Sequence, residues 1–346
     1  MRKAIICGYY GQGNAGDEAL LLAILERLPN NIKPIILSGN PLKTSKDYGV
    51  ISYSRQGIIK QIFKLGKKDL FIWGGGSLIQ DITSIKSPLF YLGLMILAQL
   101  KGLKTIAYAQ GIGPIKTPFI QWLTKQVLKR CSGVSVRDRE SAKLMEAWGI
   151  KYFIGADPVW ALSAKISQDL DLLPSPRIGV NVRLNSSLNE AKLEIIIQSL
   201  KRLQQQTLAN IILIPFQESK DLEICQKIGE LLTQNYQIVN LENPQELKGL
   251  FRELDLMIGM RLHSLIMASS EKCPCFALSY DPKVTNLMKE IDIDGYELDN
   301  FPTDVQTITK KWLKIYHNQP RLSDDNLDLL EKNALKHQTL LDIFDS

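Results

Sequence analysis

Segments with the pattern of buried strands alternate with segments that have the pattern of helices along almost the whole chain. This alternation is typical of parallel α/β sheets, in which a helix connects each strand to the next. Six strands are predicted in the first half, at residues 3–7, 34–37, 70–73, 105–109, 133–136 and 152–154. The chain is therefore expected to fold into doubly wound sheets with helices on both faces.

A polar stretch at residues 163–177, with Pro174 and Pro176, interrupts the pattern and is predicted to be a linker. After it the pattern restarts, with strands predicted at 178–182, 211–215, 237–240, 256–259 and 275–279. A chain of 346 residues is long enough for two domains with separate cores. We expect two Rossmann-like domains facing each other across a cleft, at residues 1–170 and 177–300, followed by C-terminal helices at 301–346.

The composition, with 45% hydrophobic and 23% charged residues, is that of a soluble globular protein. The net charge of +6 is mild and the Lys and Arg are scattered, which allows an anionic substrate or a membrane surface but does not indicate nucleic acid. The longest apolar run, 88–100, is too short to cross a bilayer, which leaves peripheral contact at the inner face of a membrane open.

Five cysteines, mostly within apolar segments, indicate buried thiols in a reducing compartment rather than a disulfide framework. Their spacing to histidines does not match a zinc site, so no metal is expected. The chain runs from its first residues into a predicted strand without the pattern of a signal peptide. These features predict a cytoplasmic protein.

A glycine-rich loop joins the first predicted strand to the first predicted helix, with the sequence Gly11-x-Gly13-x-x-Gly16. In that context the spacing matches the dinucleotide-binding fingerprint. Asp17 and Glu18 argue against it, because they place two carboxylates where a pyrophosphate would dock on the helix N-terminus. We therefore expect no nucleotide cofactor, and we expect the loop to present Asn14 and Asp17 to a sugar hydroxyl or to a proton in transfer.

Ligands of doubly wound sheets bind beyond the carboxyl ends of the strands. The unusual residues of this chain gather at those positions, including the run Gly74-Gly-Gly-Ser77 and the segment Asn181-Val-Arg183. We expect Gly13, Asn14, Gly75, Gly76, Gln110, Asn181 and Arg183 to contact a bound ligand at these positions.

Arg261 and His263 flank the start of a predicted helix directly after a buried strand. Arginine offers a planar pair of donors for carboxylate or phosphate, and histidine exchanges protons near neutral pH. Lys283 and Arg137 follow other strands and would add cations. The group predicts a site for a small substrate with several negative charges.

Six motifs occur in the order found in polysaccharide pyruvyl transferases, and the chain particularly resembles the cell-surface-anchoring type. They are Gly11-x-Gly13-Asn14-x-Gly16-Asp17-Glu18, Gly74-Gly-Gly-Ser77, Gln110-Gly-Ile-Gly-Pro114, Arg137-Asp138-x-x-Ser141, Ala156-Asp157-Pro158 and Arg261-Leu-His263. The resemblance implies a glycosyltransferase-B-type fold and C-terminal helices that pack back on the first domain. It also implies phosphoenolpyruvate as donor and a sugar or lipid-linked oligosaccharide as acceptor, with a cyclic pyruvate ketal and phosphate as products.

In such a reaction Arg261, Lys283 and Arg137 would hold the donor. His263 and Asp17 would form the acid–base pair, and which of them is the acid remains open. A nucleotide-sugar-dependent glycosyltransferase of the same fold and a non-catalytic binder of anionic glycans are the alternatives. His317 and His337, which lie among polar residues near the C-terminus, are expected on the surface.

Overall fold

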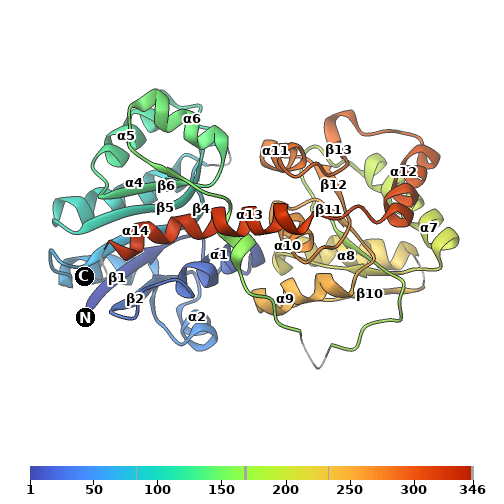
Figure 1. Cartoon of the computed structure of the whole chain (residues 1–346), viewed down its shortest axis with the longest axis horizontal. Coiled ribbons are helices and arrows are strands. Elements are labelled where there is room, and N and C mark those ends of the chain that lie inside the picture. The colour runs from blue at the N-terminus through green and yellow to red at the C-terminus, as the bar shows by residue number, and fades with distance from the viewer. Residues whose placement is uncertain (83, 167–169, 233, 344–346) are drawn as a thin grey trace. The chain divides into compact units, whose positions relative to one another are not determined.

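The computed structural model describes residues 1–82, 84–166, 170–232 and 234–343, which form two compact units (Figure 1). The first unit contains Met1–Gln12, Asp17–Leu162 and the residues from Asp328 onward. The second contains Gly13–Gly16 and Ser163–Leu327. Residues 167–169 of the predicted linker, and residues 344–346 at the end of the predicted C-terminal helices, lie outside the described residues.

The first unit is built on a seven-stranded sheet whose pairs are all parallel. Its strands are β1 (Arg2–Cys7), β2 (Ile32–Leu37), β3 (Ile51–Tyr53), β4 (Leu70–Ile79), β5 (Lys104–Ile112), β6 (Gly133–Val136) and β7 (Phe153–Ile154). The spatial order is β3-β2-β1-β4-β5-β6-β7. Strand order reverses between β1 and β4, as it does in Rossmann sheets.

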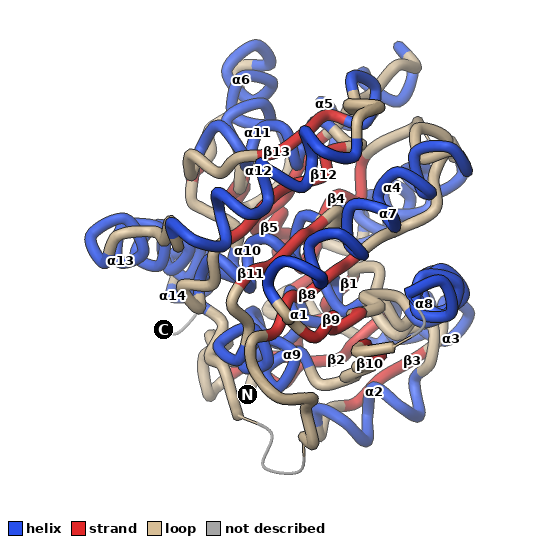
Figure 2. Tube along the Cα trace, turned by 90° about the vertical axis from the view of Figure 1, so that its right-hand side faces the viewer, coloured by secondary structure: helices blue, strands red, loops and turns tan. Residues whose placement is uncertain are grey.

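The second unit repeats this order in a six-stranded parallel sheet, β10-β9-β8-β11-β12-β13. Its strands are β8 (Arg177–Asn181), β9 (Asn210–Leu213), β10 (Tyr236–Ile238), β11 (Leu256–Gly259), β12 (Cys275–Ser279) and β13 (Gly295–Glu297). The prediction of two doubly wound sheets is confirmed, and Figure 2 shows the strands flanked by helices.

Alternate residues of the first sheet face two separate hydrophobic clusters, because successive side chains of a strand point to opposite faces. Ile5 and Trp73 face one cluster, which α3 (Arg55–Lys64), α4 (Lys86–Leu100), α5 (Pro118–Lys129) and α6 (Arg139–Trp148) also form. Ile6 and Ile72 face the other, with α1 (Ala15–Leu25) and α14 (Thr339–Asp342). The outer edge near β2 and β3 carries α2 (Pro41–Tyr48).

The core of the second unit lies between its sheet, α7 (Glu190–Thr207), α8 (Glu218–Leu232) and α12 (Val305–Asn318). Trp312 of α12 is fully buried there, against Phe276 of β12. The placement of α12 differs from the expected grouping of 301–346 with the first domain, because its apolar face packs on α7 and on the second sheet. The remaining helices are α9 (Pro244–Leu250), α10 (Leu262–Ser270) and α11 (Pro282–Glu290).

From Asp328 the chain belongs to the first unit, after the start of α13 (Asp324–Leu335). His337, which we expected on the surface, is fully buried and its Nε2 lies 2.9 Å from the carbonyl oxygen of Ala156. That expectation was wrong because the polar neighbours of His337 in sequence do not line its surroundings in space, where Tyr108 packs on its ring. His317 is exposed, as expected.

Two further predictions differ from the structure. The three-residue strands β3 and β13 were not predicted, and each lies at an edge of its sheet. The segments 74–79 and 110–112, predicted as strand-exit loops, continue β4 and β5 and pair with each other, with a register shift between Gly76 and Ile79. In the described part of the chain no helix is long and apolar enough to cross a membrane.

Candidate active site

The carboxyl ends of β8 and β11 meet where the strand order of the second sheet reverses, with Asn181 opposite Gly259. Asn181 is fully buried, donates from Nδ2 to the Ile214 carbonyl at 2.9 Å and accepts from the Arg261 amide at 3.0 Å. Both ends of the Asn181 amide thus hold the backbone, and its contact with a sugar stays a prediction. Asn181 fixes the path of the chain into Arg261.

Arg261 is also buried, and its guanidinium makes a two-pronged ion pair with Asp221 of α8. Nε donates to Oδ2 at 2.8 Å and Nη2 donates to Oδ1 at 2.6 Å. Asp221 Oδ2 further accepts from the amides of Phe216 and Gln217 at 3.0 and 2.9 Å. The pair of N–H donors that we expected to bind a substrate anion therefore binds Asp221. Nη1 is left without a partner among the described residues.

Sequence reasoning missed Asp221. Its signal was available: an acid stands four residues after Gln217, in the first turn of the helix that follows β9. In that position a carboxylate can accept from the backbone amides that enter the helix. Asp221 therefore holds both the Arg261 side chain and the backbone of residues 216–217 in place.

The loop Gly13–Gly16 groups with the second unit and packs on this edge of its sheet. The Ala15 amide donates to the Phe216 carbonyl at 2.8 Å, and Asn14 forms an isolated antiparallel bridge with Gln217. Gly16 lies so close to the His263 ring that a side chain at position 16 would overlap Nδ1. The predicted site residues Asn14, Arg261 and His263 thus belong to one cluster.

His263 lies in the first turn of α10, and Lys283 in the first turn of α11. The two helices follow the neighbouring strands β11 and β12 and contact each other. Asp281 caps α11 by accepting from the Lys283 amide at 2.9 Å. The N-termini of these two helices, with His263 and Lys283 in their first turns, add positive charge at this edge of the sheet that suits a small anion, while the charge of Arg261 is balanced by Asp221.

Arg183, half-buried beyond β8, lies over the Tyr280 ring, with its guanidinium carbon 6.0 Å from the ring centroid. Its Nη1 donates to the Tyr280 hydroxyl at 3.4 Å. The aromatic contact orients this cation at the same edge of the second sheet.

In the first unit the glycine run of β4 lies beside α1, which carries Asp17 in its first turn. Gly75 and Gly76 both have φ of +89°, which a residue with a side chain rarely adopts. A β-carbon at position 76 would lie 3.4 Å from Asp17 Oδ1. Because Gly75 and Gly76 have no side chains, they do not cover the Asp17 carboxylate.

Glu18, next to Asp17 in the chain, holds the start of the glycine loop through hydrogen bonds. Its Oε1 accepts from the Gly11 amide at 2.7 Å and its Oε2 accepts from the Tyr48 hydroxyl at 3.1 Å. Burial raises the pKa of Glu18 to about 7, although these two hydrogen bonds act in the opposite direction. Glu18 thus titrates near neutral pH at the base of the loop.

Arg137, which we predicted as a third donor cation, is held in an ion pair within the first unit. Its Nη1 donates to Asp157 Oδ2 at 2.5 Å and its Nη2 to the Ser77 hydroxyl at 3.1 Å, and both ionic partners are buried. The charge of Arg137 is balanced within the first unit, so the pair fixes the end of β6. Asp157 also accepts from the Val159 amide at 3.0 Å.

Gln110, like Arg137, is buried and hydrogen-bonded within the first unit. Its side chain is fully buried and Nε2 donates to the carbonyls of Tyr108 and Trp73, at 3.0 and 3.4 Å. Its contact with the acceptor sugar stays a prediction, and among the described residues its Oε1 is buried without a hydrogen-bond partner.

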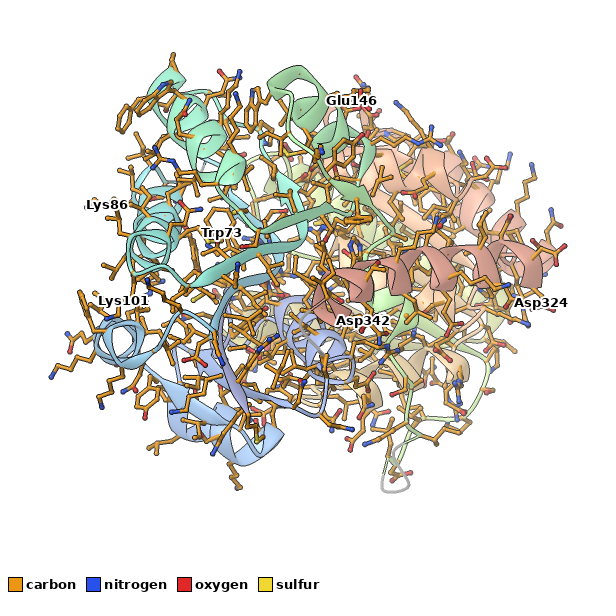
Figure 3. The ribbon with its side chains drawn as sticks, turned by 60° about the vertical axis from the view of Figure 1, so that its left-hand side comes forward. Trp73, Lys86, Lys101, Glu146, Asp324 and Asp342 are labelled. Atoms are coloured by element: carbon orange, nitrogen blue, oxygen red, sulfur yellow. The ribbon has the colours of Figure 1, made fainter. Side chains whose placement is uncertain are left out.

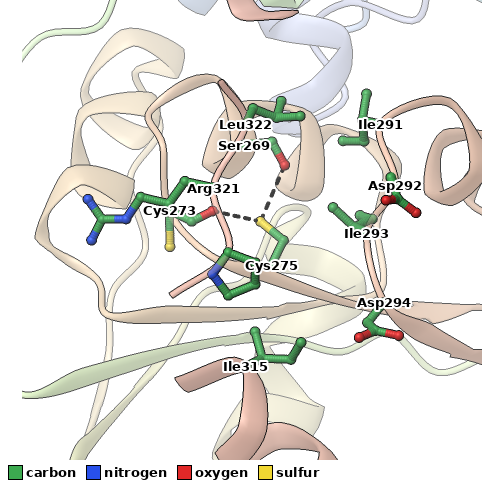
Figure 4. A pocket seen from close by; sticks show the side chains of 11 residues that line it. Ser269, Cys273, Cys275, Ile291, Asp292, Ile293, Asp294, Ile315, Arg321 and Leu322 are labelled. Atoms are coloured by element: carbon green, nitrogen blue, oxygen red, sulfur yellow. Dashed lines mark hydrogen bonds between the residues drawn. The ribbon is translucent and has the colours of Figure 1, made fainter. Parts of the chain in front are cut away.

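A small pocket lies at the carboxyl ends of β1 and β2, beside the glycine loop. It is lined by Gly8, Tyr9, Tyr10, Gln12, Leu37, Ser38, Gly39, Arg55 and Tyr91. Tyr9 and Arg55, which line this pocket, were not among the predicted site residues. A second cavity, in the second unit, is lined by Cys273, Cys275, Asp292, Asp294 and their neighbours (Figure 4). It lies at the amino end of β12, whereas Lys283 follows the carboxyl end.

The five cysteines are unpaired, and four of them are buried, whereas Cys131 is half-buried. Within residues 1–82, 84–166, 170–232 and 234–343, no group of three His, Cys, Asp or Glu side chains is arranged to hold a metal ion.

Two Rossmann-like sheets in one chain correspond to the glycosyltransferase-B-type fold, and solved structures with that fold match this chain. UDP-N-acetylglucosamine 2-epimerase from Methanocaldococcus jannaschii superposes with a TM-score of 0.69 at 12% identity, over 99% of this chain and 100% of that chain. A putative UDP-N-acetylglucosamine 2-epimerase from Listeria monocytogenes gives 0.65 at 10% identity, over 98% and 94%. HepE from Anabaena, in complex with UDP-glucose, gives 0.59 at 11% identity, over 100% and 97%.

The sequence profile of polysaccharide pyruvyl transferases matches residues 14–282. The chain belongs to the polysaccharide pyruvyl transferase family. No curated protein matches it.

Proposed function

We propose that the protein transfers the pyruvyl group of phosphoenolpyruvate to two hydroxyls of a sugar in a surface polysaccharide or its lipid-linked precursor. The observation that carries this proposal is the cluster in the second unit, in which the loop Gly13–Gly16 packs against His263 beside the Asp221-anchored Arg261. The family assignment supports the pyruvyl transfer, and the electropositive helix N-termini suit a donor with a carboxylate and a phosphate.

The reaction balances without an oxidant or reductant. A proton adds to the CH2 carbon of phosphoenolpyruvate, and the oxygen of the first sugar hydroxyl bonds to the neighbouring carbon. The second hydroxyl then bonds to the same carbon as the C–O bond to phosphate breaks. The two hydroxyl protons are recovered in the new methyl group and on the departing phosphate.

In this scheme Lys283 and Nη1 of Arg261 bind the donor anion. His263 and Asp17 serve as the acid–base pair, since the reaction requires a group that protonates carbon and a group that accepts a hydroxyl proton. Gly16, which contacts His263, directly precedes Asp17 in the chain. The proposed acceptor-binding residues remain Gly13, Asn14, Gly75, Gly76, Gln110, Asn181 and Arg183.

A nucleotide-sugar-dependent transfer is the second candidate. The structural neighbours favour it, because HepE was solved with UDP-glucose and an epimerase from Neisseria meningitidis with UDP-N-acetylglucosamine. Against it stands the family profile, which matches most of the chain.

The two candidates are separated by measuring phosphate and UDP release in parallel, with phosphoenolpyruvate or a UDP-sugar as donor and the same sugar acceptors. We expect acceptor-dependent phosphate release and no UDP release. UDP release with no consumption of phosphoenolpyruvate would replace the proposal with the second candidate. Binding of acidic glycan with neither product would indicate a non-catalytic binder.

A further inference from the structure

Three consecutive helices of the first unit, α3, α4 and α5, contain no acidic residue. Between Arg55 and Arg130 the sequence has twelve Lys and Arg but only two Asp and no Glu, a formal charge of +10. The whole chain carries +6, so the remaining residues together carry −4. The positive charge of the protein is thus concentrated in this segment.

The three helices cover the same face of the first sheet, because their buried side chains share one hydrophobic cluster. α4 contacts both α3 and α5, so their outward sides form one continuous surface. We call it the basic face. Lys86 and Lys101 lie at the two ends of α4, with Trp73 of β4 behind the helix (Figure 3).

Large apolar side chains are exposed on the basic face between its cations. They are Ile59, Phe63, Ile82, Ile85, Leu89, Leu100, Phe119 and Trp122. Phe63, Phe119 and Trp122 are each more than half exposed, and the last two stack on each other with ring centroids 6.1 Å apart. A grouping of exposed apolar side chains on this scale marks an interaction surface.

The two aspartates of the segment, already counted in its charge of +10, accept hydrogen bonds from backbone amides. Asp69 accepts from the amides of Lys3 and Gly66, both at 2.8 Å. Asp81 accepts from the amides of Lys116 and Thr117 at 2.8 and 2.7 Å, which lower its pKa. Both carboxylates are directed to backbone donors.

We propose that the basic face binds the surface of an anionic lipid bilayer, with Phe63, Phe119 and Trp122 inserted between headgroups and the lysines paired with lipid phosphates. Charge complementarity selects the partner: Lys and Arg next to a membrane are attracted by anionic lipids, and aromatic side chains prefer the interface. Exposed Ile, Leu and Phe distinguish this surface from one for a soluble polyanion, which needs cations but no aliphatic contact.

This binding is independent of the proposed reaction, because it requires neither donor nor acceptor. It would hold the enzyme where a lipid-linked acceptor resides, a consequence that does rest on the proposed function. The binding experiment below is done without substrates, so its failure would leave the proposed reaction untouched.

The test is co-sedimentation of the full chain with vesicles of phosphatidylcholine alone or mixed with phosphatidylglycerol. We expect binding only to the mixed vesicles, and weaker binding as salt rises. Lys60→Glu with Lys64→Glu should weaken it at least about tenfold, because each cation near an anionic surface contributes appreciably. The matched control is Lys310→Glu with Lys314→Glu, the same spacing on the exposed side of α12.

Insertion is tested by Phe119→Ser with Trp122→Ser, against Leu208→Ser with Leu231→Ser, which are exposed in the second unit. Of the five tryptophans, all in the described part of the chain, Trp122 is exposed and the others are buried. Its emission should therefore shift to shorter wavelength on binding. Circular dichroism melting curves of all variants should match wild type, since every substituted side chain is half-exposed or exposed.

Absence of binding to phosphatidylglycerol vesicles at low salt would overturn the proposal. So would equal losses in the control variants. A third set of results would also overturn it, in favour of a site for soluble polyanions. In that case the Phe119→Ser with Trp122→Ser variant still binds the vesicles, the Trp122 emission of the wild type does not change on binding, and a soluble sulfated polysaccharide abolishes binding.

Discussion

Arg261 and His263 are separated by one residue in the sequence, yet the structure gives them different surroundings. Arg261 is buried and held by Asp221, whereas His263 is half-buried at a helix N-terminus against Gly16. The first is positioned by its ion pair, and the second is the residue that we propose for proton transfer. Substitutions at these two positions should therefore fail in different ways.

His263→Ala is expected to abolish turnover while the melting temperature stays within a few degrees of wild type, because the side chain is only half-buried. Phosphate release and thermal melting measure the two effects. His317→Ala is the control, since His317 is exposed on α12. Full activity of His263→Ala would remove His263 from the mechanism.

Asp221→Asn should destabilise the protein by about 3–5 kcal/mol, because it leaves the buried Arg261 without its counter-charge. The second unit should unfold at lower urea concentration, and donor affinity should fall with it. Glu190→Gln breaks the exposed pair with Lys227 and should cost less than about 1 kcal/mol. Similar midpoints for both variants would contradict the role assigned to Asp221.

At the scale of elements, the glycine loop and α1 are joined by Glu18. Because its pKa is raised to about 7 in the folded protein, the carboxyl stays protonated while the unfolded chain ionises near 4.5. Its contribution to stability is complete below pH 4.5 and is lost as the pH rises through 7. Ionisation of the buried Glu18 carboxyl is therefore predicted to lower the stability of the folded protein as the pH rises towards 7.

Glu18→Gln tests this effect, because the amide cannot ionise. The difference in melting temperature, wild type minus variant, should decrease between pH 5 and pH 8 by roughly 2–4 °C for each kcal/mol involved. Glu146→Gln is the matched control, since Glu146 accepts from the Tyr152 hydroxyl at an exposed position. A constant difference for Glu18→Gln would rule out its titration in this range.

The elements that sequence predicted well are those with strong local patterns. The apolar strands from β1 to β12 that lie inside their sheets were found, as was the doubly wound order. β3 and β13 were missed, whereas the comparably short edge strands β7 and β10 were predicted, so length alone did not decide which strands were found. The burial of Arg137 and Gln110 was not foreseen, because a strand-exit position in sequence does not reveal burial and the partner Asp157 is twenty residues from Arg137.

At the scale of the whole molecule, the chain returns to its first unit after completing the second. Leu340 and Leu341 are buried in the cluster formed by β1 and α1, and His337 lies against Ala156. No local pattern around His337 marks it as buried, because the residues that enclose it come from the distant segment near β5 and β7. The first unit is thus completed by the C-terminal segment.

Burial lowers the pKa of His337 to about 4, so the folded protein keeps it neutral while the unfolded chain takes up a proton below 6.5. Stability attributable to His337 is therefore lost as the pH falls from 6.5 towards 4. His337→Gln keeps a donor for the Ala156 carbonyl but cannot ionise. The excess stability of wild type over this variant should shrink on acidification, and parallel melting curves across that range would contradict the assignment.

The central claim is that phosphoenolpyruvate donates its three carbons to two hydroxyls of one sugar. We would incubate the protein with ¹³C-labelled phosphoenolpyruvate and a panel of sugar acceptors, including lipid-linked disaccharides, and examine the acceptor by NMR. The account predicts a labelled ketal carbon bonded to two sugar oxygens, formed with one equivalent of phosphate and absent with His263→Ala. An acceptor that gains a sugar from a UDP-sugar, and no labelled carbon, would contradict it.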